Sequence, residues 1–188
     1  MLVEVMLMLA LLFGILCFGR MLLQYGRLHI DHPLAQLTMR STQWLVKPLR
    51  RLVPPLGWFD MASVVAALVF MYVMHLLVAL VLFKDISVLG KGLFLAGSVL
   101  ATVLMALKAL SYALLMGLLI QTILSWQQQR THLLTVMQKI YQPLTKPFSW
   151  MRYKQFDFSA AILALFLWWW LVALLPYLQQ ILNNWYLQ

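Results

Sequence analysis

Hydrophobic and polar residues follow one another along this chain in long blocks. Four apolar blocks cover residues 2–23, 61–83, 93–126 and 158–175, the last closed by Pro176, and most basic residues lie between them. A helix needs about 20 apolar residues to cross the hydrocarbon core of a bilayer. The first, second and fourth blocks therefore each predict one transmembrane helix. The third is too long for one straight crossing and too short for two with a turn between them.

The positions of the cations decide how often the chain crosses the membrane. Residues 25–59 and 127–156 carry ten of the 14 lysines and arginines. Loops rich in Lys and Arg stay cytoplasmic, and two loops on one side need an even number of crossings between them. We therefore predict four transmembrane helices, with both basic loops cytoplasmic and both termini on the outer side.

The third block then supplies one crossing, which we assign to residues 107–126. This choice places Lys108 at the outer interface, because a lysine at the bilayer centre costs about 2.5–3.5 kcal/mol. Residues 86–106 either lie as a helix on the outer leaflet or extend the third helix at a tilt. The sequence leaves both arrangements open.

The basic segments at 33–53 and 131–148 are predicted to be amphipathic helices. In the second segment, apolar residues recur at i, i+3, i+4 and i+7, whereas Gln138, Lys139 and Gln142 lie on the opposite side. Such helices lie in the headgroup layer with their cations toward anionic lipid. The expected fold class is an all-α membrane protein with four transmembrane helices and basic interfacial amphipathic helices.

The two basic segments are also similar to each other. "HPLAQLTMRSTQWLVKPL" at 32–49 aligns with "THLLTVMQKIYQPLTKPF" at 131–148, and Phe59-Asp60 aligns with Phe156-Asp157 after a two-residue contraction. We therefore expect two parallel repeats, at residues 1–85 and 107–188, joined by residues 86–106 as a linker or outer-leaflet helix. The Lys-Pro pair at 47–48 is expected to end the first basic helix, because a residue before proline disfavours the helical region.

Composition supports a membrane protein and limits its partners. The chain is 64% hydrophobic and only 10% charged, with a mean hydropathy of +0.87, whereas a soluble domain is about half apolar and a quarter charged. The formal charge of +9 lies in segments that flank the membrane. Anionic lipid headgroups are therefore the expected partner, and nucleic acid is not.

The run "KPLRRLVPPLGWFD" at 47–60, just before an apolar helix, resembles the YggT family of bacterial and plastid membrane proteins. The likeness covers nearly the whole chain in its duplicated form, although the second copy, "KPFSWMRYKQFD" at 146–157, lacks the paired arginines and later prolines. The resemblance implies a bacterial inner-membrane protein, so the outer side that the charges assign to both termini is the periplasm. It also implies links to osmotic and ionic stress tolerance, to cell division or envelope organisation, and in plastids to maturation of a membrane cytochrome.

Asp60 and Asp157 begin the second and fourth blocks. We interpret both as N-caps, because a carboxylate there accepts the free N–H groups of the first helical turn and favours the positive helix end. Asn also caps well, so Asp60→Asn is expected to be mild. The alternative hypothesis pairs the two carboxylates as a cation or proton site, which acids within membranes often form.

The basic loops supply the predicted site for lipid and for a second, membrane or membrane-associated, protein. Its residues are Arg40, Lys47, Pro48, Arg50, Arg51, Pro54, Lys139, Lys146, Pro147, Arg152 and Lys154. No metal or cofactor is expected, because Cys17 is the single cysteine and His29, His32, His75 and His132 lack a ligand set. The sequence also lacks a recognisable catalytic motif, which predicts a protein that is not an enzyme.

Two hypotheses for function follow. The first is a non-enzymatic protein that organises or helps assemble membrane machinery through its basic loops, with self-association open. The second is a small transporter or channel that supports ion or osmotic balance. It would need an oligomer lined by Ser111, Tyr112, Gln121 and Thr122. Ion flux in proteoliposomes distinguishes the two.

Reporter fusions test the topology. We expect cytoplasmic signals from reporters after residues 45 and 140, and periplasmic signals after residues 90 and 188, because both basic loops are retained inside. A cytoplasmic signal after residue 90 or 188 would contradict the arrangement of four crossings.

Overall fold

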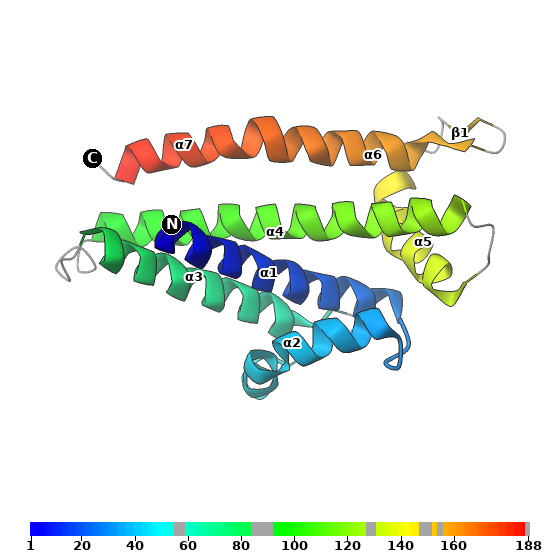
Figure 1. The fold of residues 1–188 in the computed structure, drawn as a ribbon, viewed down its shortest axis with the longest axis horizontal. Helices are drawn as coiled ribbons and strands as arrows, with labels where there is room; N and C mark the ends of the chain where they lie inside the picture. Colours follow the sequence, from blue (N-terminus) through cyan, green and yellow to red (C-terminus); the bar gives the residue numbers. More distant parts are fainter. Residues whose placement is uncertain (55–58, 84–91, 127–130, 147–151, 154–155, 187–188) are drawn as a thin grey trace.

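The computed structural model describes residues 1–54, 59–83, 92–126, 131–146, 152–153 and 156–186 (Figure 1). Nearly all of the described chain is helical. The elements are α1 (Leu2–Gly26), α2 (Pro33–Leu49), α3 (Met61–Phe83), α4 (Gly92–Trp126), α5 (His132–Thr145), β1 (Arg152–Tyr153), β2 (Phe156–Asp157), α6 (Phe158–Trp169), a π-helical turn (Trp170–Leu174) and α7 (Leu175–Tyr186).

Among the described residues, four helical stretches are long and apolar enough to cross a membrane: α1, α3, α4 and the continuous α6–α7. This result confirms the predicted all-α fold with four candidate spans. The crossing that the sequence assigns to residues 107–126 lies within α4, which is one helix of 35 residues. At about 1.5 Å per residue it is about 52 Å long, against about 30 Å of hydrocarbon. Residues 92–106 therefore extend the third helix, which is one of the two arrangements that the sequence leaves open.

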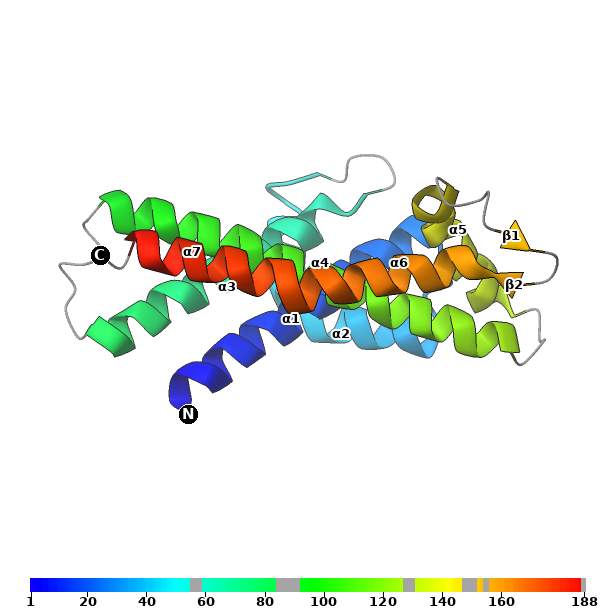
Figure 2. The same ribbon diagram turned by 90° about the horizontal axis from the view of Figure 1, so that it is seen from above.

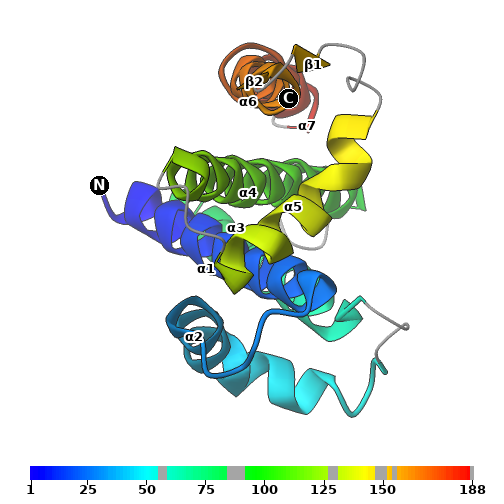
Figure 3. The ribbon, with the colours of Figure 1, turned by 90° about the vertical axis from the view of Figure 1, so that its right-hand side faces the viewer.

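Helix α4 is the centre of the bundle. It lies between the α6–α7 rod on one side and α1 with α3 on the other, and α2 lies beyond α1 (Figures 1 and 3). Seen from above, α6–α7 runs along α4 while α1 crosses beneath it (Figure 2). The basic helices α2 and α5 lie toward one end of the molecule, and the C-terminal ends of α3 and α7 lie toward the other (Figure 1).

Small residues spaced four apart bring α1, α3 and α4 together. The buried pairs are Ala10 and Gly14 on α1, Ala62 and Ala66 on α3, and Ala109 and Ala113 on α4. Residues four apart lie on the same helix face, and small side chains there let helix backbones approach closely. The resulting van der Waals contacts hold helices together in a membrane, where no hydrophobic effect acts between them. The first core is built around these faces.

Helix α2 continues past the point where the sequence predicts its end. Pro48 lies inside the helix, which runs to Leu49 before turns at Arg50 and Arg51. The predicted break at Lys47-Pro48 is therefore wrong. In the last helical turn a proline removes only its own N–H bond, and the N–H of Arg50 still bonds to the Val46 carbonyl at 3.0 Å.

A proline is also accommodated in the last span. The fourth block was expected to close at Pro176, but α7 carries the helix through it to Tyr186. The π-helical turn from Trp170 to Leu174 comes immediately before. A proline disrupts the hydrogen bond to the carbonyl four residues earlier, and a widened π-turn next to it absorbs this local mismatch.

The second amphipathic helix packs on protein. Val136, Met137, Ile140 and Tyr141 of α5 are buried against α1, α4 and α6. The Tyr141 hydroxyl donates to the Leu114 carbonyl of α4 at 2.7 Å, and burial raises the pKa of Tyr141. The apolar face of α5, which the sequence assigned to the headgroup layer, therefore belongs largely to the protein core, whereas Gln138 and Lys139 remain exposed.

The contact between α4 and α5 makes Gly117 sensitive to substitution. A Cβ at Gly117 would collide with the Tyr141 hydroxyl. We expect Gly117→Ala to lower the free energy of unfolding by about 1–3 kcal/mol, the usual range for overpacking. The measurement is thermal unfolding of purified protein in detergent.

Gly19→Ala is the matched control, because its new Cβ would meet only Thr38 Cγ2 at 3.8 Å. This control should be neutral or slightly stabilising, since alanine favours a helix over glycine by about 1 kcal/mol. Adding Tyr141→Phe to Gly117→Ala should restore part of the loss by removing the colliding hydroxyl. Equal stability of the two alanine variants would contradict the close contact.

Candidate functional site

An arginine lies buried in the first candidate span. Arg20 belongs to α1 and its side chain is only 4% exposed. A buried charge is costly unless opposite charge and hydrogen bonds compensate it. The compensation comes from residues that are distant in sequence and that converge on α1 from α2 and from the start of α3.

The counter-charge is Asp60, which directly precedes α3 and is also 4% exposed. Its Oδ2 atom lies 3.5 Å from Arg20 Nε and 2.8 Å from Arg50 Nη2. The Ser63 hydroxyl donates to the same oxygen at 2.7 Å. We name Arg20, Asp60, Arg50 and Ser63, with Gln24 and Thr42 described next, the Arg20–Asp60 cluster.

Two further polar residues complete the cluster. Arg20 Nη1 donates to the Thr42 hydroxyl of α2 at 3.0 Å, and that hydroxyl donates to the Thr38 carbonyl at 2.7 Å. Gln24 lies one turn after Arg20. In the amide orientation that satisfies both groups, Gln24 donates to Asp60 Oδ2 at 2.9 Å and accepts from Arg50 Nη2 at 3.2 Å. The cluster thus joins α1, α2 and the start of α3.

Asp60 stands where a cap is expected but binds different groups. Oδ2 accepts from side chains, and Oδ1 has no hydrogen-bond partner among the described residues. The predicted capping bond to a backbone N–H of α3 is therefore replaced by ion pairs. Burial alone raises the pKa of Asp60, but hydrogen bonds from Arg50 and Ser63 and the charges of Arg50 and Arg20 outweigh it and hold that pKa below its ordinary value.

The cluster carries excess positive charge. Two guanidinium groups face one carboxylate, and Arg50 is 43% exposed while Arg20 and Asp60 are buried. Arg50 thus links the buried carboxylate to the surface. Outside the cluster, the Phe59 ring stacks on Tyr25 of α1 with centroids 5.1 Å apart, which brings the residue before Asp60 against the same helix.

The predicted basic residues of the first loop lie on the surface around this cluster. The exposed ones are Arg40, Lys47, Pro48, Arg51 and Pro54. Leu37 and Trp44 of α2 are exposed on the same helix. The Trp44 ring also contacts Phe13 of α1 at a centroid distance of 5.6 Å. Cationic and aromatic groups therefore share the outer surface of α2, and Thr38 and Thr42 face inward.

The second loop is described only in part. Lys139 and Lys146 are exposed, whereas Pro147, Lys154 and the side chains of Arg152 and Asp157 lie outside the described residues. Asp157 directly precedes α6, as Asp60 precedes α3. All the partners of Asp60 named above come from the first basic loop and its flanking helices.

The aligned positions of the two loops carry different chemistry. Thr42 aligns with Tyr141, and both side chains point at the preceding long helix, where Thr42 meets Arg20 and Tyr141 meets Gly117. The first contact therefore carries a charge, whereas the second is made by an uncharged ring and hydroxyl. The aligned residues His32 and Thr131 keep one role, because each accepts a hydrogen bond from a backbone N–H at the start of its helix.

Sequence reasoning missed Arg20, Gln24, Thr42 and Ser63. A signal for Arg20 existed, since an arginine inside an apolar helix calls for a buried counter-charge. Asp60 begins the next span on the same predicted side of the membrane. The Thr and Ser partners carry no such signal, because their hydroxyls are common on helices.

Several histidines and the hydroxyls of Ser111 and Thr122 on α4 have local partners. His32 Nδ1 accepts from the Leu34 N–H, and His29 pairs with the exposed Asp31 at 3.1 Å. Within the described ranges, no group of three His, Cys, Asp or Glu residues could hold a metal. On α4, the hydroxyls of Ser111 and Thr122 donate to carbonyls of their own helix.

The cluster reverses the expectation that Asp60→Asn has a mild effect. Removing the carboxylate charge leaves Arg20 buried beside Arg50, so we expect a loss of about 3–5 kcal/mol in the free energy of unfolding. Adding Arg20→Met should recover a large part of this loss, because the unpaired buried charge disappears. Unfolding of the purified single and double variants in detergent measures both effects.

Asp31→Asn is the control, since Asp31 is exposed and pairs with His29 at the surface. It should change the stability by less than about 0.5 kcal/mol. If Asp60→Asn were as stable as the wild type, the charge of Asp60 would not hold the cluster together.

Comparison with known proteins agrees with the sequence pattern and the fold. The CCB3/YggT family model matches residues 1–81, the part that contains the Arg20–Asp60 cluster. The protein named "Uncharacterized protein YggT" of Escherichia coli (strain K12) is 30% identical over 151 residues, covering 79% of this chain and 75% of its own length.

The "Uncharacterized protein in proC 3'region" of Vibrio alginolyticus is 33% identical over 129 residues, covering 68% of this chain and 67% of its own. No solved structure matches the chain. A multi-pass arrangement of apolar helices, the basic proline-containing loop before Asp60 and these relatives together show that the chain belongs to the YggT family.

Proposed function

We propose that the protein is a non-enzymatic, multi-pass inner-membrane protein that organises or helps assemble membrane machinery. Its first basic loop would bind anionic lipid headgroups and a second membrane or membrane-associated protein on the cytoplasmic side. The observation that carries the proposal is the Arg50–Asp60 ion pair at 2.8 Å. It ties the end of α2 to a buried carboxylate and so fixes the position of a cationic surface.

The composition of this surface supports lipid and protein contacts together. Arg40, Lys47 and Arg51 are exposed on or just after α2, together with Trp44 and Leu37. Each cation near an anionic membrane surface contributes about 1 kcal/mol, and tryptophan favours the interface of membrane and water. Trp and Arg are also enriched where proteins bind each other.

Rigid placement supports a docking role. Arg20 of α1 donates a hydrogen bond to Thr42 of α2, and the rings of Phe13, Trp44 and Phe70 pack where α1, α2 and α3 meet. A surface whose backbone and neighbouring side chains are already fixed loses less conformational entropy on binding. The first loop therefore suits partner recognition better than a free basic tail would.

The two loops should contribute unequally. We expect Arg50→Ala with Arg51→Ala to weaken partner binding more than Arg152→Ala with Lys154→Ala, because Arg50 pairs with Asp60 in the Arg20–Asp60 cluster. The measurement places a photo-crosslinking amino acid at Trp44 in intact membranes and follows one defined protein adduct. The adduct should fall about tenfold in the first double variant and less than twofold in the second.

Arg51→Ala alone separates recognition from stability. Arg51 is exposed, so this change should leave the thermal stability intact while it lowers the adduct. A crosslinker at the exposed Leu165 of α6 gives the background for contacts with lipid. Equal adduct yields at both positions, or equal effects of the two double variants, would contradict the proposal.

A further inference from the structure

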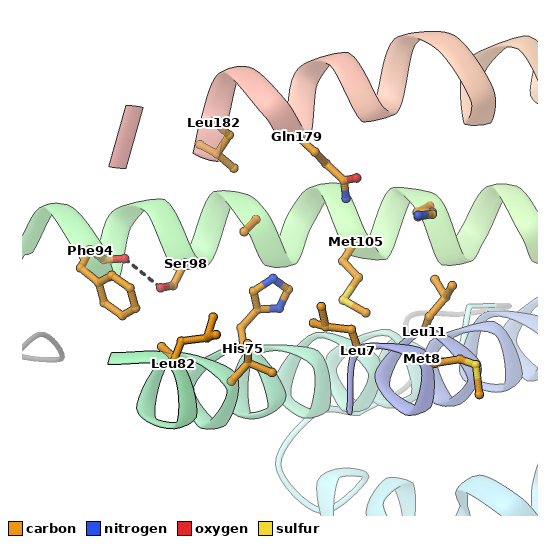
Figure 4. A pocket seen from close by; sticks show the side chains of 14 residues that line it. Leu7, Met8, Leu11, His75, Leu82, Phe94, Ser98, Met105, Gln179 and Leu182 are labelled. Carbon is orange, nitrogen blue, oxygen red and sulfur yellow. Dashed lines mark hydrogen bonds between the residues drawn. The ribbon is translucent and has the colours of Figure 1, made fainter. Parts of the chain in front are cut away.

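A cavity of about 490 Å³ lies in the half of the bundle away from α2 and α5. Its walls come from α1, α3, α4 and α7 (Figure 4). Ligand sites in proteins usually measure about 300–1,000 Å³ and combine apolar walls with a few polar groups. This cavity has both properties, and neither proposed loop contributes to it.

Polar groups from three helices line the cavity. They are His75 of α3, Ser98 and Lys108 of α4, and Gln179 of α7. Figure 4 shows the imidazole of His75 between α3 and α4, and the amide of Gln179 pointing from α7 toward α4. Ser98 donates to the Phe94 carbonyl at 2.8 Å and His75 Nδ1 lies 3.3 Å from the Met71 carbonyl, so these two are engaged locally.

The cavity has a positive charge without a described counter-charge. Lys108 forms no ion pair with any residue in the described ranges, and none of the described residues that line the cavity is acidic. The nearest described acid along α1 is Glu4, which pairs with the α-amino group of Met1 at 3.4 Å and is exposed. A lysine inside a candidate span without a carboxylate favours an anionic ligand.

The remaining walls favour a hydrocarbon chain. Leu7, Leu11, Val78, Phe94 and Met105 contribute apolar surface. A second cavity of about 400 Å³ lies between α4 and α7 and shares Leu182 with the first. The described residues that line it are all Leu, Val or Ile. One site therefore offers charge and apolar surface together, and its neighbour offers apolar surface alone.

We propose that the cavity between α1, α3, α4 and α7 binds a single-chain amphiphile with an anionic head, held by Lys108 and Gln179, and with its hydrocarbon tail along the apolar walls. The head chemistry is a carboxylate or a phosphate. A free fatty acid and a lysophospholipid are the two sources of this chemistry. The site is separate from the proposed docking surface on α2, so either can fail without the other.

Native mass spectrometry of the protein in a neutral detergent tests the proposal with three probes of equal chain length. The probes are palmitate, palmitoyl lysophosphatidate and hexadecanol. We expect the two anionic probes to form adducts at about tenfold lower concentration than hexadecanol, a difference of about 1.4 kcal/mol. The stronger of the two anionic adducts identifies the source. Equal binding of anionic and neutral probes would overturn the proposal.

Variants locate the site. Lys108→Met removes the charge and leaves an apolar side chain of similar length. It should weaken the anionic adducts about tenfold, to the level of hexadecanol. The binding of hexadecanol itself should not change. Lys139→Met is the matched control, because Lys139 is exposed on α5. An equal loss in both variants, or none in Lys108→Met, would overturn the assignment.

A second variant guards against a folding defect. Ala101→Phe fills the cavity from α4, where Ala101 lines the wall, and should reduce the anionic adducts without removing the charge. Thermal unfolding of each variant confirms that it is folded. Undiminished anionic binding in a folded Ala101→Phe protein would show that the ligand lies elsewhere.

Discussion

The buried guanidinium of Arg20 is the constraint on which the first half of the molecule depends. A charge that is 4% exposed inside an apolar bundle is tolerated only when opposite charge and hydrogen bonds surround it. Asp60 brings the start of α3 to α1, and Thr42 brings the middle of α2 to the same place. Arg50 then holds the end of α2 against Asp60, which sets where the basic loop lies.

This arrangement gives a physical reason for the Lys-Pro-Leu-Arg-Arg run. Pro48 has no N–H and so removes one hydrogen bond from the last turn of α2, but the helix continues to Leu49. The chain turns immediately afterwards, where Arg50 meets Asp60. Arg51, the next residue, remains exposed. Of the two adjacent arginines, Arg50 therefore pairs with a buried carboxylate, whereas Arg51 stays on the surface. They are not equivalent, although the sequence presents them as a pair.

The second basic helix, α5, is held in place by different chemistry. Helix α5 packs on α4 through Tyr141 and Gly117, an apolar contact with one hydroxyl, where the first half has an arginine and a threonine. An apolar contact of this kind stabilises the bundle but places no charge in it. The first loop, in contrast, combines a fixed position with several cations. The cavity beside Lys108 lies at the opposite end of the bundle.

The sequence by itself determined the coarse structure of this protein. Block lengths and hydropathy identify four apolar helices, because the bilayer thickness fixes the number of apolar residues that a crossing needs. The positions of α2 and α5, and Asp60 just before α3, also follow from the pattern. The family is evident from the same basic, proline-containing run.

Only the tertiary structure decided which polar groups meet. Asp60 reads as a cap from the sequence, because a carboxylate before a helix has a local use, but its partners Arg20, Arg50 and Gln24 come from other elements. The apolar face of α5 fits a membrane surface equally well, and packing against α1 and α4 decides its place. Residues 92–106 continue α4 as one helix, and Phe94, Ala101 and Met105 on it are buried. Contacts between distant elements leave no local pattern, and for that reason the sequence could not specify them.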